Sequence, residues 1–174
     1  MAASDFDFER NLSRHHEAVS RFVEAALRLD DVAWQARAAA DKWCPGQVAE
    51  HVALLYGVLL RELHGQGEPP RIRVSFWKSM LLRWRVMPQI LNEGRFPKAR
   101  APREIRPPDA PRAQKTVLDA LRHDADLFET ALAEARARGE GRLTHIYFGR
   151  LRPDQMLRFV TVHTDHHRRQ LPGA

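Results

Sequence analysis

The sequence has little cysteine and no long apolar run. Its single cysteine, Cys44, excludes an internal disulfide and is typical of a protein from a reducing compartment. No apolar stretch approaches the roughly 20 residues that cross a bilayer, and the apolar residues at 80–87 are interrupted by arginines. The acidic, amphipathic first residues lack the pattern of a signal peptide. We therefore expect a cytoplasmic protein with no membrane partner.

Negative charge is also in the minority. The chain has 28 lysines and arginines against 22 aspartates and glutamates, which gives a net charge of +6. This balance permits anionic partners, but by itself it governs electrostatic steering and not the fold or the reaction. The length of 174 residues suits one domain, residues 1–174. A chain of this size buries roughly 70% of its unfolded surface, so it needs no disulfide for stability.

The apolar residues of four segments recur at the three- and four-residue steps of amphipathic helices. These segments are residues 5–29, 46–64, 112–138 and 153–171. Residues 65–111 hold most of the prolines and many arginines, so we expect an ordered but irregular crossover there. Within this crossover, residues 75–90 have the character of a short helix. The pattern therefore predicts an all-α domain.

Aromatic and basic residues are interleaved in this crossover. Phe76, Trp77 and Trp84 lie among lysine and arginine residues, an arrangement that can serve as a stacking surface for nucleic acid. Composition alone is weak evidence for such a partner. The commoner arrangement has a solvated basic face with the aromatic side chains packed into the core, and this is the one we expect.

The last helix carries two histidines on the face that should enter the core. His163 and His167 are four residues apart, so they lie one turn apart and can bind a single metal ion together. Histidines near a helix C-terminus also complement the helix dipole, which is the structural alternative. On the second helix, His51 has the same inward phase. Three imidazoles would form a site with a coordination position open to water or substrate.

Four other residues have structural interpretations that we weigh against functional ones. His15 continues the apolar stripe of the first helix and is expected as a core or rim histidine. His166 lies beside the inward face and is expected at its rim. His145 lies in a compact turn expected at residues 144–149, where backbone groups would satisfy it. Cys44 precedes the proline that opens the second helix, and we expect it to be structural and not a reactive thiol.

Three motifs carry a resemblance to a known family. They are W-C-P-G-Q-x-x-x-H at residues 43–51, H-x-x-F-G-x-L at 145–151 and H-x-x-x-H-R-x-Q at 163–170. In this order they resemble the DinB-like family, in particular a bacterial branch of it. The similarity is strongest over residues 40–60 and 143–171. The sequence departs from the family pattern at Cys44, where serine is common, and at Arg169, where glycine is frequent.

The resemblance implies a four-helix bundle with one long crossover connection, to which the short helix is added. It also implies that His51, His163 and His167 bind a divalent metal ion. Three imidazoles suit zinc first, with nickel or iron as alternatives. The catalytic groups are not assigned by the resemblance.

The same resemblance implies that the protein transfers a low-molecular-weight thiol to an electrophile, with hydrolysis as another reaction class. Gln170, Glu62 and His145 are candidates for orienting the ligands or an incoming group. A non-catalytic, metal-stabilised ligand-binding protein is the alternative, and a nucleic-acid-binding protein is less favoured. Small molecules are the expected partners, and a homodimer is left open.

Overall fold

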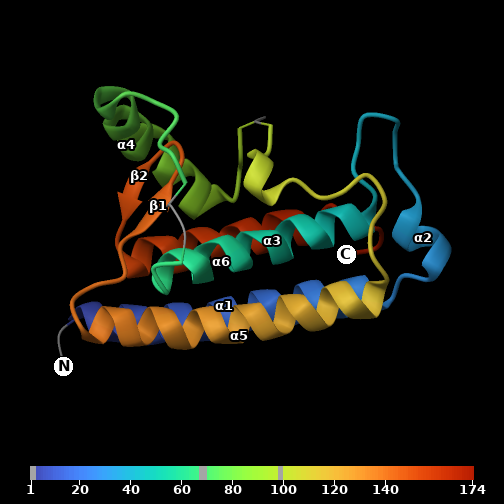
Figure 1. The fold of residues 1–174 in the computed structure, drawn as a ribbon, viewed down its shortest axis with the longest axis horizontal. Coiled ribbons are helices and arrows are strands. Elements are labelled where there is room, and N and C mark those ends of the chain that lie inside the picture. The colour runs from blue at the N-terminus through green and yellow to red at the C-terminus, as the bar shows by residue number, and fades with distance from the viewer. Residues whose placement is uncertain (1–2, 67–69, 98–99) are drawn as a thin grey trace.

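Four long helices form the body of the protein (Figure 1). The computed structural model describes residues 3–66, 70–97 and 100–174. The long helices are α1 (Ala3–Leu27), α3 (Pro45–Leu63), α5 (Gln114–Ala137) and α6 (Pro153–Arg168). The elements outside these four are α2 (Asp31–Gln35), α4 (Phe76–Glu93), the 3-10 helix η1 (Arg103–Ile105), and the strands β1 (Leu143–His145) and β2 (Gly149–Leu151). The predicted all-α class is therefore confirmed, with only a short two-stranded sheet added.

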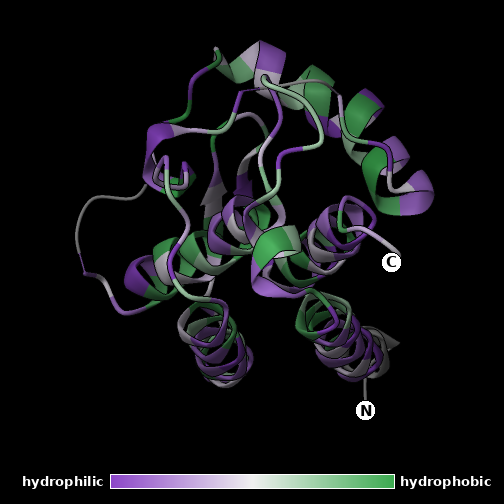
Figure 2. Cartoon of the chain, turned by 90° about the vertical axis from the view of Figure 1, so that its right-hand side faces the viewer, coloured by the Kyte–Doolittle hydropathy of each residue, from purple (hydrophilic) through white to green (hydrophobic). Residues whose placement is uncertain are grey.

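The bundle consists of two helix pairs. α3 packs chiefly on α5, and α6 packs chiefly on α1. Helices α1 and α6 run in one direction, while α3 and α5 run in the other (Figure 1). Because α3 and α5 are parallel neighbours, the chain must return along the whole bundle between them, and residues 64–113 make this crossover. Figure 2 looks along the bundle and shows the crossover lying over one side of the four helices.

A chain of buried hydrogen bonds connects all four long helices. Glu129 of α5 accepts a hydrogen bond from His15 Nδ1 of α1 at 2.5 Å. His15 Nε2 lies 2.8 Å from the hydroxyl of Tyr56 on α3, and this hydroxyl lies 3.0 Å from Thr164 Oγ1 on α6. His15, Tyr56 and Thr164 are each fully buried. The expectation of a core histidine at position 15 is confirmed, and its polar atoms are satisfied as burial requires.

The end of the crossover is attached to the first turns of α3. Gln47 Nε2 donates to the carbonyls of Pro108 and Asp109 at 2.8 and 3.0 Å. The buried carboxylate of Glu50 accepts hydrogen bonds from both the backbone N–H and the Nε of Arg112, at 3.0 and 2.7 Å. These bonds fix the N-terminal end of α5 beside the N-terminal end of α3.

Gly46 occupies a place where the backbone must approach its neighbours closely. A Cβ atom at this position would lie 2.6 Å from the Cβ of Pro111 and 2.7 Å from Trp34 Nε1. Trp34 is the buried residue of α2, and its Nε1 donates to the carbonyl of Arg112 at 3.0 Å. Only glycine therefore fits at the second residue of α3 with these neighbours in place.

The crossover helix α4 differs from the expectation in two ways. It ends at Glu93, three residues beyond the expected helix of residues 75–90, and it contains the exposed Pro88. The aromatic residues Phe76, Trp77 and Trp84 were expected to pack into the core. This expectation was wrong, since their side chains are 70–76% exposed. Helix phase does not account for this, because Met87 shares the phase of Phe76 and Met80. Two of the three buried positions, Met87 and Ile90, lie in the second half of the helix, whereas the aromatic residues lie in the first.

Residues 143–151 form an antiparallel hairpin where only a compact turn was expected. Leu143 pairs with Leu151, and His145 pairs with Gly149, whose φ is +69°. The carboxylate of Glu62 accepts hydrogen bonds from the N–H and the hydroxyl of Thr144 at 2.9 and 2.6 Å. Glu62 thus attaches the hairpin to the C-terminal turn of α3. None of the helices in the described ranges is long and apolar enough to cross a bilayer.

We expect Tyr56→Phe to destabilise the fold, because it leaves His15 and Thr164 without their shared partner in the core. The free energy of unfolding should fall by about 1–3 kcal/mol, the cost of unsatisfied buried polar groups. Urea denaturation followed by circular dichroism measures the change. Tyr147→Phe removes the same hydroxyl from a half-buried tyrosine and is the control. Equal effects of the two substitutions would show that the chain of hydrogen bonds contributes nothing.

Candidate metal centre

Three histidines from two helices converge at one end of the bundle. His51 of α3 and His163 and His167 of α6 each present a ring nitrogen, and these three nitrogens lie within 4.8 Å of one another. The Nε2 atoms of His163 and His167 are 3.2 Å apart. Their rings are 4.4 Å apart between centroids, and the ring of His51 lies 4.7 Å from that of His167. The convergence expected from the helix phases is therefore confirmed.

Hydrogen bonds to the outer ring nitrogens orient two of the three imidazoles. His51 Nδ1 donates to the carbonyl of Ile105 in η1 at 2.7 Å. His167 Nδ1 donates to Gln170 Oε1 at 3.0 Å. In both rings the proton is thus held on Nδ1, which leaves the Nε2 lone pair for the centre. The third ring differs, because the buried His163 Nδ1 has no hydrogen-bond partner among the described residues.

Aromatic rings cover the three histidines. Trp43, which precedes α3, lies against His51 with 5.0 Å between ring centroids. Phe96, which follows α4, lies 5.6 Å from His163 and 4.8 Å from His166. All three converging histidines are buried as a result. The side chains that shield the centre therefore come from the two segments that flank it in space, one before α3 and one in the crossover.

Burial keeps the three imidazoles neutral. It lowers the pKa of His167 to about 3, an effect reinforced by His51 and opposed by the hydrogen bond with Gln170. The pKa of His163 is also lowered well below its ordinary value, first by burial and then by the nearby His167 and His51. Burial lowers the pKa of His51 too, against the hydrogen bond with Ile105. Neutral imidazole is the form that binds metal ions.

The donor set fits a divalent metal ion. Three ligands at the usual zinc–nitrogen distance in a tetrahedral site are about 3.3 Å apart, and the Nε2 atoms of His163 and His167 are 3.2 Å apart. Two further features of metal sites are present: neutral rings and outer nitrogens held by a carbonyl or an amide. The group of His51, His163 and His167, called the histidine triad below, could therefore hold an ion with one position left open.

The structure separates the three residues that were candidates for orienting ligands. Gln170 lies at the triad, bonded to His167 as described, and its Nε2 is 3.0 Å from His166 Nε2. Glu62 lies away from the triad, near the C-terminal end of α3, where Thr144 occupies its carboxylate. The inward phase of His51 recurs at Glu62, but along the helix the two are about 16 Å apart. The phase of a residue around a helix therefore does not show how far along the helix axis it lies.

His145 is satisfied by the backbone, as expected for a histidine in a turn. Its Nδ1 accepts hydrogen bonds from the N–H groups of Tyr147 and Phe148, both at 3.2 Å. The ring of Phe159 lies between it and the triad, with centroids 4.7 Å from His145 and 6.0 Å from His163. Burial lowers the pKa of His145 to about 4.

The sequence did not predict two groups that contact the triad, the carbonyl of Ile105 and the ring of Phe96. The carbonyl of Ile105 carries no signal, because every residue has one and the choice depends on the path of the crossover. Phe96 had a weak signal as an aromatic residue in a proline-rich loop, but nothing placed it near the histidines. Both lie in the crossover, whose course is determined by packing and not by periodicity.

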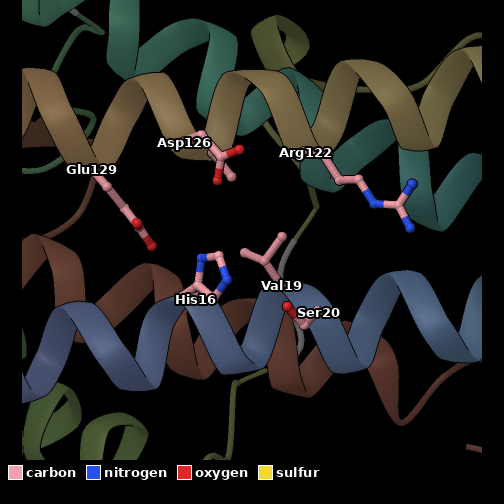
Figure 3. A pocket seen from close by; sticks show the side chains of 7 residues that line it. His16, Val19, Ser20, Arg122, Asp126 and Glu129 are labelled. Atoms are coloured by element: carbon pink, nitrogen blue, oxygen red, sulfur yellow. The ribbon is translucent and has the colours of Figure 1, made fainter.

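A second group of potential ligands lies in a surface groove between α1 and α5. His16, Asp126 and Glu129 face one another across it, in a cavity of about 240 Å³ (Figure 3). One ligand atom of each lies within 4.8 Å of the other two. However, His16 and Asp126 are exposed, and Glu129 already accepts the hydrogen bond of His15. The buried triad is therefore the stronger metal site.

The fold and the triad together define a class of protein. Four helices with a long crossover between the second and third carry a histidine centre that could hold a metal ion. A comparison with known families gives the same class, since the model of the DinB superfamily matches residues 14–171. The chain belongs to the DinB superfamily, as its motifs indicated. No curated protein and no solved structure matches it significantly.

We expect a bound divalent ion to stabilise the fold, because it joins α3 to α6. With zinc at a hundred times its dissociation constant, mass action adds about 2.7 kcal/mol, or roughly 5–10 °C in Tm for a domain of this size. His163→Ala should abolish this increment and His123→Ala, at an exposed position on α5, should keep it. Thermal unfolding with and without zinc measures both. An equal increment in the two variants would place the ion elsewhere.

The lowered pKa of His145 gives an expected dependence of stability on pH. The fold favours the neutral ring, so below about pH 6.5 the unfolded chain takes up a proton that the folded chain refuses. Stability is therefore lost as the pH falls from about 6.5 to about 4. This one group contributes up to about 3 kcal/mol of that loss.

His145→Asn keeps an acceptor for the backbone N–H groups but does not titrate. Between pH 6.5 and pH 4.5 the metal-free variant should lose less stability than the metal-free wild type. The slopes of unfolding free energy against pH should differ by the amount that corresponds to about one bound proton. Urea denaturation at a series of pH values gives both slopes. Parallel curves would contradict the assignment of a depressed pKa to His145.

Proposed function

We propose that this chain is a metal-dependent enzyme that transfers a low-molecular-weight thiol to an electrophile. The observation that supports it most is the convergence of three neutral imidazoles at one buried point, with their outer nitrogens held. His51, His163 and His167 would hold the ion through Nε2, with zinc as the first expectation and nickel or iron as alternatives. Once bound, the ion lowers the pKa of a nearby thiol so that thiolate is present at neutral pH.

The surrounding residues have distinct roles in this reaction. Gln170 orients the ring of His167, and the carbonyl of Ile105 orients that of His51. The rings of Trp43 and Phe96 exclude water from the triad, which protects a thiolate from hydration and strengthens its interactions. The sulfur forms a bond to the electrophilic carbon, the leaving group departs with the bonding electron pair, and the thiol proton passes to solvent.

Positive charge near the triad favours an anionic thiol. Arg168 and Arg169 follow His167 directly, and Arg169 approaches Gly94 at the end of α4. Arg168 is half-buried and lies 3.5 Å from Asp165, so Arg169 is the more exposed of the two. Low-molecular-weight thiols that carry carboxylates would be drawn to this end of the bundle. The attraction should weaken as salt is added.

A non-catalytic, metal-stabilised ligand-binding protein is the second candidate. It is favoured by the burial of the triad, since each of its histidines is at most 9% exposed. A metal that only joins helices needs no access for substrate, whereas a catalytic one keeps an open position. The two functions make opposite predictions for turnover.

We expect metal-dependent conjugation of a small anionic thiol to an electrophile. The initial rate is measured against a panel of thiols with the metal removed and then restored. His51→Ala should reduce the rate at least about 100-fold, since loss of a metal ligand removes the centre itself. His16→Ala is the matched control, because it removes an exposed histidine of the surface groove and should leave the rate unchanged. If no thiol reacts faster with the metal-loaded protein than with the metal-free one, the thiol-transfer function is wrong and the ligand-binding function replaces it.

A further inference from the structure

One face of α4 carries the largest group of exposed apolar side chains in the described part of the chain. Of the nine large apolar residues that are exposed there, six lie between positions 72 and 84. Five of them are on α4 at the spacing i, i+1, i+4, i+5, i+8, which places them on one helical face. We call this the α4 face; it consists of Phe76, Trp77, Met80, Leu81 and Trp84, which are 50–76% exposed.

The α4 face is exposed on a well-formed helix and not on a loosely packed one. The Ser75 side chain caps the first turn by accepting from Lys78 N–H, and Gly94 ends the helix in the left-handed conformation. Other residues of α4 attach the helix to the bundle. Arg83 donates to Gln155 at 2.8 Å, and Arg158 of α6 donates to Asn92 at 2.8 Å. A helix that is held by these contacts and still presents exposed aromatic residues has a surface available for a partner.

The charged residues that lie beside the α4 face are basic, and the carboxylate of the helix, Glu93, is its last residue. Residues 70–92 contain lysine and arginine but no aspartate or glutamate. Lys78 and Arg85 are exposed beside the apolar residues, and the guanidinium of Arg85 lies 5.8 Å from the centroid of the Trp84 ring. Tryptophan and phenylalanine on one face, with basic residues at its edge, are the composition of helices that lie in the headgroup region of anionic bilayers.

We propose that α4 is a peripheral membrane-binding helix that inserts its apolar face into anionic lipid surfaces. A second copy of the chain fits this surface less well. A two-fold dimer would place the patch against itself and bring Lys78 and Arg85 toward their own copies, with no carboxylate in residues 70–92 to pair with them. Nucleic acid also fits less well, because Met80 and Leu81 form part of the face and offer no stacking surface.

This proposal replaces the expectation of no membrane partner, which depended on the lack of a spanning run. A helix that lies in the interface needs no such run. The proposal is independent of the thiol-transfer function and of the metal, since none of the triad contributes to the α4 face. The chain continues from α4 through Gly94 to Phe96, which covers the triad, so the membrane-binding helix is connected directly to the segment that shields the centre.

The experiment is vesicle co-sedimentation of the full chain. One set of vesicles is phosphatidylcholine alone, and the other is equimolar phosphatidylcholine and phosphatidylglycerol. The wild type should bind the anionic vesicles, bind the zwitterionic ones weakly, and be released by added salt. The emission of the exposed Trp77 and Trp84 should shift to the blue on binding, while Trp34 and Trp43, which lie outside α4, add a constant background.

Two pairs of variants test the face and the charge separately. Trp77→Ser with Trp84→Ser should weaken binding at least about tenfold, while Leu27→Ser with Val32→Ser, at exposed apolar positions on α1 and α2, should not. Lys78→Glu with Arg85→Glu should weaken binding by roughly fivefold or more for each residue changed. Arg14→Glu on α1 with Arg28→Glu, directly after α1, makes the same change in net charge and should have the smaller effect. Circular dichroism verifies that each variant keeps its helix content.

Several results would overturn the proposal. One is a wild type that does not bind anionic vesicles; another is equal binding by the tryptophan variants and their control. A concentration-dependent dimer that the tryptophan substitutions dissociate, in a protein that ignores vesicles, would assign the face to a second copy. Binding of single-stranded DNA that is lost in the same variants, again without vesicle binding, would assign it to nucleic acid.

Discussion

The bundle depends on one chain of buried hydrogen bonds that passes from Glu129 to His15, Tyr56 and Thr164. Each of its three links crosses between the α3/α5 pair and the α1/α6 pair. Apolar packing between the pairs is not directional. The buried polar chain adds direction, because a shift of one pair along the other would separate each member from its partner. Since Thr164 follows His163 directly, these hydrogen bonds also fix the position of His163 relative to α3, which carries His51.

Much of the fold could be predicted because helices leave a periodic record in the sequence. The inward phase of His51, His163 and His167 followed from spacing alone, and the motifs around them gave the family. Position along the helix axis left no such record. Glu62 shares the phase of His51 but binds the hairpin about three turns away, about 16 Å along the helix.

The crossover shows a second limit of sequence reasoning. Its helix α4 was expected, but the exposure of its aromatic residues was not, because a helical pattern does not show which stretch of the helix packs on the bundle. Ser79, Met87 and Ile90 pack, and the tryptophans remain outside. The carbonyl of Ile105 and the ring of Phe96 reach the triad only through the path of this segment. Periodicity in the sequence predicts helices, so it predicts the histidines of the centre but not the groups that the crossover contributes to it.

Gly46 lies near the candidate metal centre and limits how far α3 can shift along its axis. Because no side chain fits between Pro111 and Trp34 at this position, the first turn of α3 is seated against both of them. When one end of a helix is fixed, the position of every residue along its axis is fixed as well. If α3 moved by one residue, His51 would be displaced by about 1.5 Å, several times the roughly 0.2 Å tolerance of metal–ligand distances. The glycine of W-C-P-G-Q thus contributes no atom to the centre, yet it sets the precision with which the centre is assembled.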